Sequence, residues 1–162
     1  MLLLSGAYLG PSLNLQSPIK NQKWIKVSVF NLTEGKDNTM RKRGTAVVVR
    51  DGKFLLVRDR GKKQYSLPGG GAHRKEPSMA AAIRELYEEL EMRAKKSERI
   101  LGCDYKGSLN THGVSLIETD DEPRLRGKEL DEFIWWDMKL DIPRYPHVDH
   151  ILNKIKLHLQ LE

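Results

Sequence analysis

The stretch GGAHRKEPSMAAAIRELYEELEM, residues 70–92, decides the fold of this chain. Its second half has the apolar period of an amphipathic helix, and Pro77 suits the first helical position. We therefore predict a helix over residues 78–90 whose apolar face packs on the core through Met79, Ile83, Leu86 and Leu90. Three consecutive glycines, Gly69–Gly71, come shortly before it; we expect them to exclude regular structure and to let the backbone approach a ligand closely.

Three carboxylates, Glu85, Glu88 and Glu89, lie at positions i, i+3 and i+4 of the predicted helix and therefore share one face. Like charges at this spacing destabilise a helix by about 0.2–0.5 kcal/mol per pair, so a counter-charge is expected. Arg84, four residues before Glu88, offsets part of that cost. A divalent cation such as Mg²⁺, which prefers oxygen ligands, would offset all of it, and the glycine loop could add a backbone carbonyl.

The complete pattern is far more specific than the acidic run, which alone is typical of a solvated helix face. Counting from Gly70, Glu76 follows after five residues, and Arg84 begins the charged run after seven more. A chance match is expected in about one such chain in ten thousand, or more rarely. The pattern resembles the Nudix box, the signature of the MutT-type nucleotide pyrophosphohydrolases.

One position departs from that box. The family usually has a glycine where this chain has Glu91, and that glycine normally ends the helix. Its loss predicts a helix that continues toward Arg93, without affecting the acidic face. The flanking sequence is also similar to the family, from the hairpin signal Asp51-Gly52 to the late strand that contains tryptophan, so the resemblance extends from about residue 41 to the end.

The resemblance implies an α/β fold, an α/β/α sandwich with a mixed β-sheet, and assigns roles to individual residues. Mg²⁺ or Mn²⁺ would be held by the Gly70 carbonyl, Glu85, Glu88 and Glu89, while Glu76 would support the loop–helix geometry. Catalytic roles would fall to Glu85, Glu88, Arg84, which would hold the glutamates in place, and an acid from outside the box. Candidates for that acid are Glu118, Glu122 and Glu129, of which Glu129 is favoured. Substrate would contact Arg43, Gly69 and Gly70.

The rest of the chain reads as alternating strands and a final helix. We expect strands at residues 24–30, 45–49, 54–57, 100–105, 114–118 and 133–136, and an amphipathic helix at 147–159. Residues 1–39 are interpreted as an N-terminal extension with one added strand, and residues 40–162 as the hydrolase domain. The added strand would extend the sheet or form a homodimer interface.

Composition restricts the class of protein. The chain has 162 residues, 39% hydrophobic and 31% charged, which fits one globular domain. Its apolar runs are too short to cross a bilayer, and its one cysteine fits a reducing compartment, so we expect a cytoplasmic protein without membrane contact. A formal charge of +6 suits phosphate-rich ligands, although charge alone favours solubility as its explanation. Nucleic acid is an improbable partner because no basic-aromatic surface is evident.

The expected function is Mg²⁺-dependent hydrolysis of a nucleoside diphosphate linked to another moiety, by water attack on phosphorus. (Deoxy)nucleoside triphosphates, ADP-ribose and dinucleoside polyphosphates all stay open as substrates. Two alternatives remain: a catalytically quiet nucleotide-binding regulatory module, and an RNA 5′-end pyrophosphohydrolase. Among other residues, a tryptophan could stack on a base, Tyr65 and His112 could contact substrate, and His147 and His150 are interpreted as surface residues.

Overall fold

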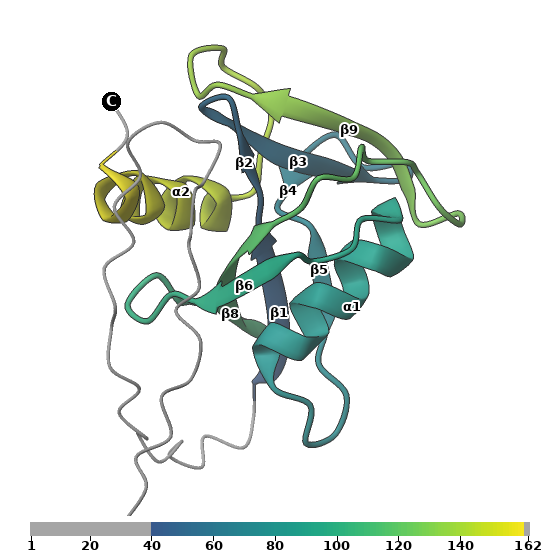
Figure 1. Ribbon diagram of the computed structural model, residues 1–162, viewed down its shortest axis with the longest axis vertical. Helices are drawn as coiled ribbons and strands as arrows, with labels where there is room; N and C mark the ends of the chain where they lie inside the picture. Colours follow the sequence, from purple (N-terminus) through teal and green to yellow (C-terminus); the bar gives the residue numbers. More distant parts are fainter. Residues whose placement is uncertain (1–39, 161–162) are drawn as a thin grey trace, which may run out of the picture.

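The computed structural model describes residues 40–160, and the strand expected at residues 24–30 lies outside them. Two sheets lie between two helices, with α1 on one side and α2 on the other (Figure 1). The expected α/β/α sandwich with a mixed sheet is confirmed. No helix of the described part is long and apolar enough to span a membrane.

The first sheet is mixed and carries the glycine-rich segment at its edge. Its strand order is β5-β1-β8-β6, and the short β7 also pairs with β8. Strands β1 and β8 run parallel, whereas the other pairs are antiparallel. The bounds are β1 Arg41–Val47, β5 Gly69–Gly71, β6 Lys96–Arg99, β7 Tyr105–Lys106 and β8 Asn110–Glu118.

The second sheet is antiparallel and is built on the predicted hairpin. Its strands are β2 Val49–Arg50, β3 Lys53–Asp59, β4 Tyr65–Ser66 and β9 Leu130–Trp136. Asp51 and Gly52, with φ of 49° and 73°, join β2 to β3. Two consecutive positive φ angles are what a tight hairpin turn of the favoured hand requires. The Asp-Gly signal therefore places the turn correctly.

Alternation along the strands divides the core into two layers. In β3, Leu55 and Val57 face the cluster that includes the apolar side of α1 (Ser78–Leu90), whereas Phe54 and Leu56 face the cluster beneath α2 (Pro146–Leu159). This period-2 pattern lets one strand be buried on both faces. Helix α1 buries Ala81, Ala82, Leu86 and Leu90, and α2 buries Val148, Ile151, Leu152 and Ile155.

Three local expectations were wrong. Gly69–Gly71 do form a strand, because they pair with β1 in the register Gly44↔Gly70. Glycine is needed at position 69, since a Cβ there would overlap the Gly44 carbonyl. Helix α1 does not continue toward Arg93: it ends at Leu90, because Glu91 adopts the left-handed conformation (φ 57°) usually given to glycine. The strand expected at 100–105 instead occupies Lys96–Arg99, and a turn with Gly102 at φ 87° follows it.

The two adjacent tryptophans of β9 point to opposite faces, as their neighbouring positions predict. Trp136 is buried in the α2-side core and donates its indole N–H to the Leu140 carbonyl at 2.9 Å. Trp135 lies at the edge of the α1-side cluster, 4.8 Å from the Arg50 guanidinium. Trp136 is therefore a core residue.

Candidate active site

The acidic face of α1 meets the loop between β8 and β9 at a small cavity. This cavity has a volume of about 300 Å³ and is lined by Glu85, Glu88, Glu89, Arg126, Gly127, Lys128 and Glu129. The structure therefore brings the three box glutamates together with Glu129. The other two candidate acids lie elsewhere: Glu118 pairs with Lys96 at 3.1 Å and Glu122 with Arg50 at 2.6 Å.

Arg84 connects the glycine-rich loop to the acidic face. It donates two hydrogen bonds of 3.0 Å to Glu76, one of 2.8 Å each to Glu85 and Glu88, and one of 3.0 Å to the Gly71 carbonyl. These bonds from Arg84, together with the His73 backbone N–H, lower the pKa of the Glu76 carboxyl to about 2. A network of charge-assisted bonds of this kind fixes side-chain rotamers.

The strand β5 places its backbone directly against this face. A Cβ added at Gly70 would overlap the carboxylate of Glu85, so only glycine fits there without moving that side chain. The neighbouring Gly69 N–H donates to Glu89 Oε2 at 3.2 Å. The edge strand and the helix therefore hold two of the carboxylates close to one short stretch of main chain.

Glu89 is the box glutamate whose pKa is raised by burial. Burial raises its pKa to about 8, and the charge of Glu85 adds to this, whereas the Gly69 N–H and Arg43 oppose it. Asp59, at the end of β3, also raises the pKa. Sequence reasoning missed Asp59, because only the pairing of β3 in the second sheet brings it near the box.

The donor set fits a divalent cation. Carboxylate oxygens and backbone carbonyl oxygens are the ligands that Mg²⁺ and Mn²⁺ prefer, and the poorly solvated Glu89 lacks a cationic hydrogen-bond partner in the described part. As they stand, no three His, Cys, Asp or Glu side chains within residues 40–160 converge as a metal site, and Glu85 and Glu88 instead share the Arg84 guanidinium. Metal binding therefore requires these two side chains to turn toward Glu89.

A second cavity is lined in part by Arg43. Its volume is about 450 Å³, and its lining includes Asp59, Ser66 and several rings: Tyr105, His112, Tyr145 and His147. Arg43 donates to the Gly69 carbonyl at 2.5 Å, so it joins this cavity to the glycine strand. Of the basic run at residues 41–43, Arg43 is the member that lines the cavity.

His112 and His147 form the wall of this cavity. Their rings stack with centroids 4.5 Å apart, and His112 Nδ1 lies 3.0 Å from the Thr45 hydroxyl. Burial lowers the pKa of His112 to about 4 and that of His147 to about 3. The interpretation of His147 as a surface residue was wrong, because α2 begins with its first turn against β4, where His147 Nε2 lies 3.1 Å from the Ser66 hydroxyl. His150 is exposed, as expected.

Tyr65 does not line either cavity. Its side chain is buried in the α2-side core, and its hydroxyl donates to Glu132 Oε2 at 2.6 Å. Burial raises the pKa of this phenol, and the bond to Glu132 adds to the shift. Tyr65 is therefore a packing residue of β4.

Comparison with known proteins agrees with this geometry. The NUDIX domain model matches residues 40–148, and no curated protein gives a significant match. Solved structures with the same fold include a MutT NUDIX hydrolase from Burkholderia pseudomallei, with 24% identity and a TM-score of 0.59 over 74% of this chain and 96% of that one. An ADP-ribose pyrophosphatase from Streptococcus suis has 15% identity and a TM-score of 0.62 over 76% and 96%. A C. elegans Ap4A hydrolase has 19% identity and a TM-score of 0.58 over 75% and 98%.

The family match covers most of the described residues and includes the whole acidic helix and the glycine strand. The solved structures add the fold: two sheets between two helices. The chain therefore belongs to the Nudix family of hydrolases, which act on pyrophosphate bonds.

Proposed function

We propose that this protein hydrolyses a nucleoside diphosphate linked to another moiety, using Mg²⁺ or Mn²⁺ held by the Gly70 carbonyl, Glu85, Glu88 and Glu89. The observation that carries the proposal is the meeting of Glu85, Glu88 and Glu89 with Glu129 around one cavity of about 300 Å³. Oxygen donors of this kind, set beside the backbone of a glycine strand, suit a metal–diphosphate complex.

The ion would screen the charge of the diphosphate, which otherwise repels a nucleophile, and would lower the pKa of a bound water. Side chains of the protein supply the proton transfer and the orientation of the ligands. Glu88 or Glu129 accepts the proton of the attacking water while the oxygen of that water bonds to phosphorus. The bond between that phosphorus and the bridging oxygen breaks, giving a nucleoside monophosphate and the other phosphorylated half. Arg84 orients the glutamates through its bonds to Glu85 and Glu88.

The second cavity is the proposed site for the part of the substrate beyond the diphosphate. Arg43 lies between the glycine strand and this cavity, where its guanidinium can meet a phosphate. The stacked rings of His112 and His147 offer a flat, uncharged surface on which a base or a sugar can pack. Substrates of the structural neighbours, ADP-ribose and a dinucleoside tetraphosphate, are compatible with two adjacent cavities.

Residues 40–162 are the proposed hydrolase domain, which the family match over residues 40–148 supports. The role of the preceding extension, including a part in a homodimer, stays a prediction that the mass of the full chain in solution can test.

The test is a substrate panel with Mg²⁺ or Mn²⁺ and products identified by chromatography. It would contain a nucleoside triphosphate, ADP-ribose, a dinucleoside tetraphosphate and 5′-triphosphorylated RNA. We expect metal-dependent release of a nucleoside monophosphate from at least one free nucleotide, and loss of this activity in Glu89→Gln but not in Glu118→Gln. Tight binding without turnover of any substrate, or equal activity in both variants, would contradict the proposal.

A further inference from the structure

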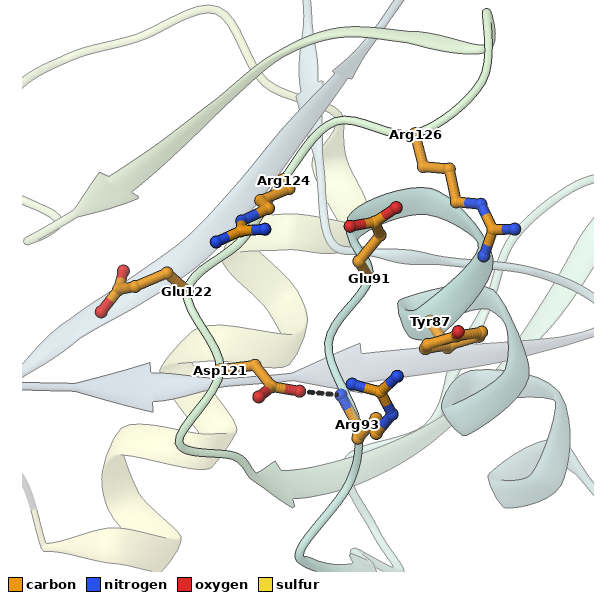
Figure 2. A pocket seen from close by; sticks show the side chains of 7 residues that line it. All are labelled: Tyr87, Glu91, Arg93, Asp121, Glu122, Arg124 and Arg126. Carbon is orange, nitrogen blue, oxygen red and sulfur yellow. Dashed lines mark hydrogen bonds between the residues drawn. The ribbon is translucent and has the colours of Figure 1, made fainter.

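A third cavity, lined by polar side chains, lies at the C-terminal end of α1. Its volume is about 380 Å³, and Figure 2 shows its lining residues: Tyr87, Glu91, Arg93, Asp121, Glu122, Arg124 and Arg126. Three arginines from two separate segments therefore converge on one hollow. Nothing in the proposed mechanism uses Arg93 or Arg124.

Among the residues that the structure describes, these three guanidinium groups have no carboxylate partner. Within residues 40–160, no Asp or Glu oxygen lies within ion-pair distance of Arg93, Arg124 or Arg126, although the protein pairs many of its other arginines in this way: Arg50, Arg58, Arg84, Arg99 and Arg144. Two of the acids in the lining are already engaged. Asp121 accepts the Arg93 backbone N–H at 2.8 Å, and Glu122 pairs with Arg50. The N–H donor is neutral, so Asp121 keeps its charge and opposes the cationic groups together with Glu91, and with Glu122 assigned to Arg50 the lining has one net positive charge.

The arginines are held apart by defined contacts. The guanidinium groups of Arg93 and Arg126 lie 5.2 and 5.5 Å from the ring centre of Tyr87, and Figure 2 shows them flanking that ring. The backbone N–H groups of Arg124 and Arg126 donate to the Leu90 and Glu89 carbonyls, each at 2.9 Å. The loop is therefore anchored to the end of α1, and its arginine side chains project from a fixed main chain.

The hollow is continuous with the proposed metal site. Arg126 lines both this cavity and the cavity that contains Glu85, Glu88 and Glu89. Lys128, which lies between Arg126 and Glu129 in the sequence, also lines the glutamate cavity. A cationic path thus leads from the acidic face to the three arginines. A guanidinium group can donate hydrogen bonds to two phosphate oxygens at once. With a neutral ligand, these N–H donors would bond to water instead.

Complementing the negative end of the α1 dipole is one reason for cations here. That role needs a single charge near the last turn, and it does not require the three groups to line one hollow or to lack carboxylate partners.

We propose that the cavity formed by Tyr87, Arg93, Arg124 and Arg126 binds phosphate groups of an oligophosphate chain that extends beyond the bond being cleaved. This inference rests on the proposed function for its link to catalysis, but the anion site itself does not. It selects substrates with three or more consecutive phosphates over those with two.

The first experiment measures binding without catalysis. Sodium tripolyphosphate is titrated into the full chain by calorimetry, in buffer freed of divalent ions on a chelating resin. We expect the double variant Arg93→Gln/Arg124→Gln to bind at least about tenfold more weakly than wild type, because charge-assisted bonds to phosphate are lost. The matched control, Lys53→Gln/Lys139→Gln, removes the same charge from exposed positions elsewhere and should change the affinity less than about twofold. Thermal unfolding of both variants checks that they fold.

The second experiment measures kinetics with Mg²⁺. The arginine variant should raise KM for a dinucleoside tetraphosphate about tenfold with kcat unchanged, and leave KM for ADP-ribose within about twofold. Equal weakening of tripolyphosphate binding in both double variants, or none in the arginine variant, would overturn the anion site. Tripolyphosphate binding that depends on the arginines, in a protein that hydrolyses no substrate, would instead overturn the proposed function and leave the anion site standing.

Discussion

The backbone of Gly70 lies directly against the carboxylate of Glu85, so closely that a Cβ would occupy the position of the carboxylate carbon and oxygens. Neither residue can change without affecting the other. The relationship explains why the box begins with a glycine: the residue is needed for closeness to the acidic face, since Gly70 itself is not in the left-handed region.

Gly70→Ala should therefore abolish most activity without unfolding the protein. The methyl group must push the Glu85 side chain away, and a misplacement of about 1 Å in a catalytic site costs about 100-fold in rate. Steady-state kinetics with Mg²⁺ and thermal unfolding measure the two effects. Gly71→Ala is the matched control, because a Cβ there meets nothing within 4 Å. Equal activity of the two variants would contradict the steric account.

Glu129 should matter more than the other two candidate acids. If it accepts the proton of the attacking water, Glu129→Gln lowers kcat by at least about 100-fold. Glu122→Gln should stay close to wild type, because Glu122 pairs with Arg50 outside the cavity of the glutamates. A normal kcat in Glu129→Gln would assign the proton acceptor to Glu88 alone.

Glu91 lies in a conformation that suits glycine, and this gives a prediction about stability. At φ 57° a residue with a Cβ is strained, so Glu91→Gly should stabilise the protein by about 1 kcal/mol. Glu91→Ala keeps the Cβ and should give no such gain. Chemical denaturation of the two variants measures the difference, and a Glu91→Gly protein no more stable than Glu91→Ala would show that the strain is absent.

The stacked histidine pair predicts how stability depends on pH. The folded-state pKa values of His112 and His147, about 4 and about 3, lie below the ordinary value of 6.5. Their contribution is therefore fully present above pH 6.5 and is lost as the pH falls from there toward the folded-state values, because the unfolded chain binds protons first. Each histidine adds a slope of up to about 1.4 kcal/mol per pH unit in this window. His147→Asn should reduce the slope measured by denaturation between pH 6.5 and 4, while a slope equal to that of wild type would show that folding does not keep His147 neutral.

Much of the site follows from local sequence. The spacing of Glu85, Glu88 and Glu89 places them on one helix face whatever the rest of the chain does, and the apolar period fixes which side of α1 is buried. The contacts of Arg84 with Glu88 and Glu76 also follow, since Glu88 lies one helical turn away and Glu76 lies near the end of the loop that precedes the helix.

The remainder depends on contacts between distant segments. The glycines form strand β5 only because β1 is available to pair with them. Glu91 adopts its left-handed conformation where the chain turns and buries Met92 completely. No local sequence signal for the end of a helix predicts this turn. Asp59 and His147 reach the cavity beside Arg43 from β3 and α2, so only the assembled fold places them there.

The central claim is that the acidic face of α1 binds a divalent ion, and titration of Mn²⁺ followed by electron paramagnetic resonance tests it most directly. Wild type should take up the ion, and Glu85→Gln/Glu89→Gln should weaken uptake at least about tenfold, while Glu118→Gln/Glu122→Gln, which removes as many carboxylates elsewhere, should not. Uptake that is equally strong in both double variants, or no uptake by wild type in the presence of a diphosphate substrate, would contradict the account.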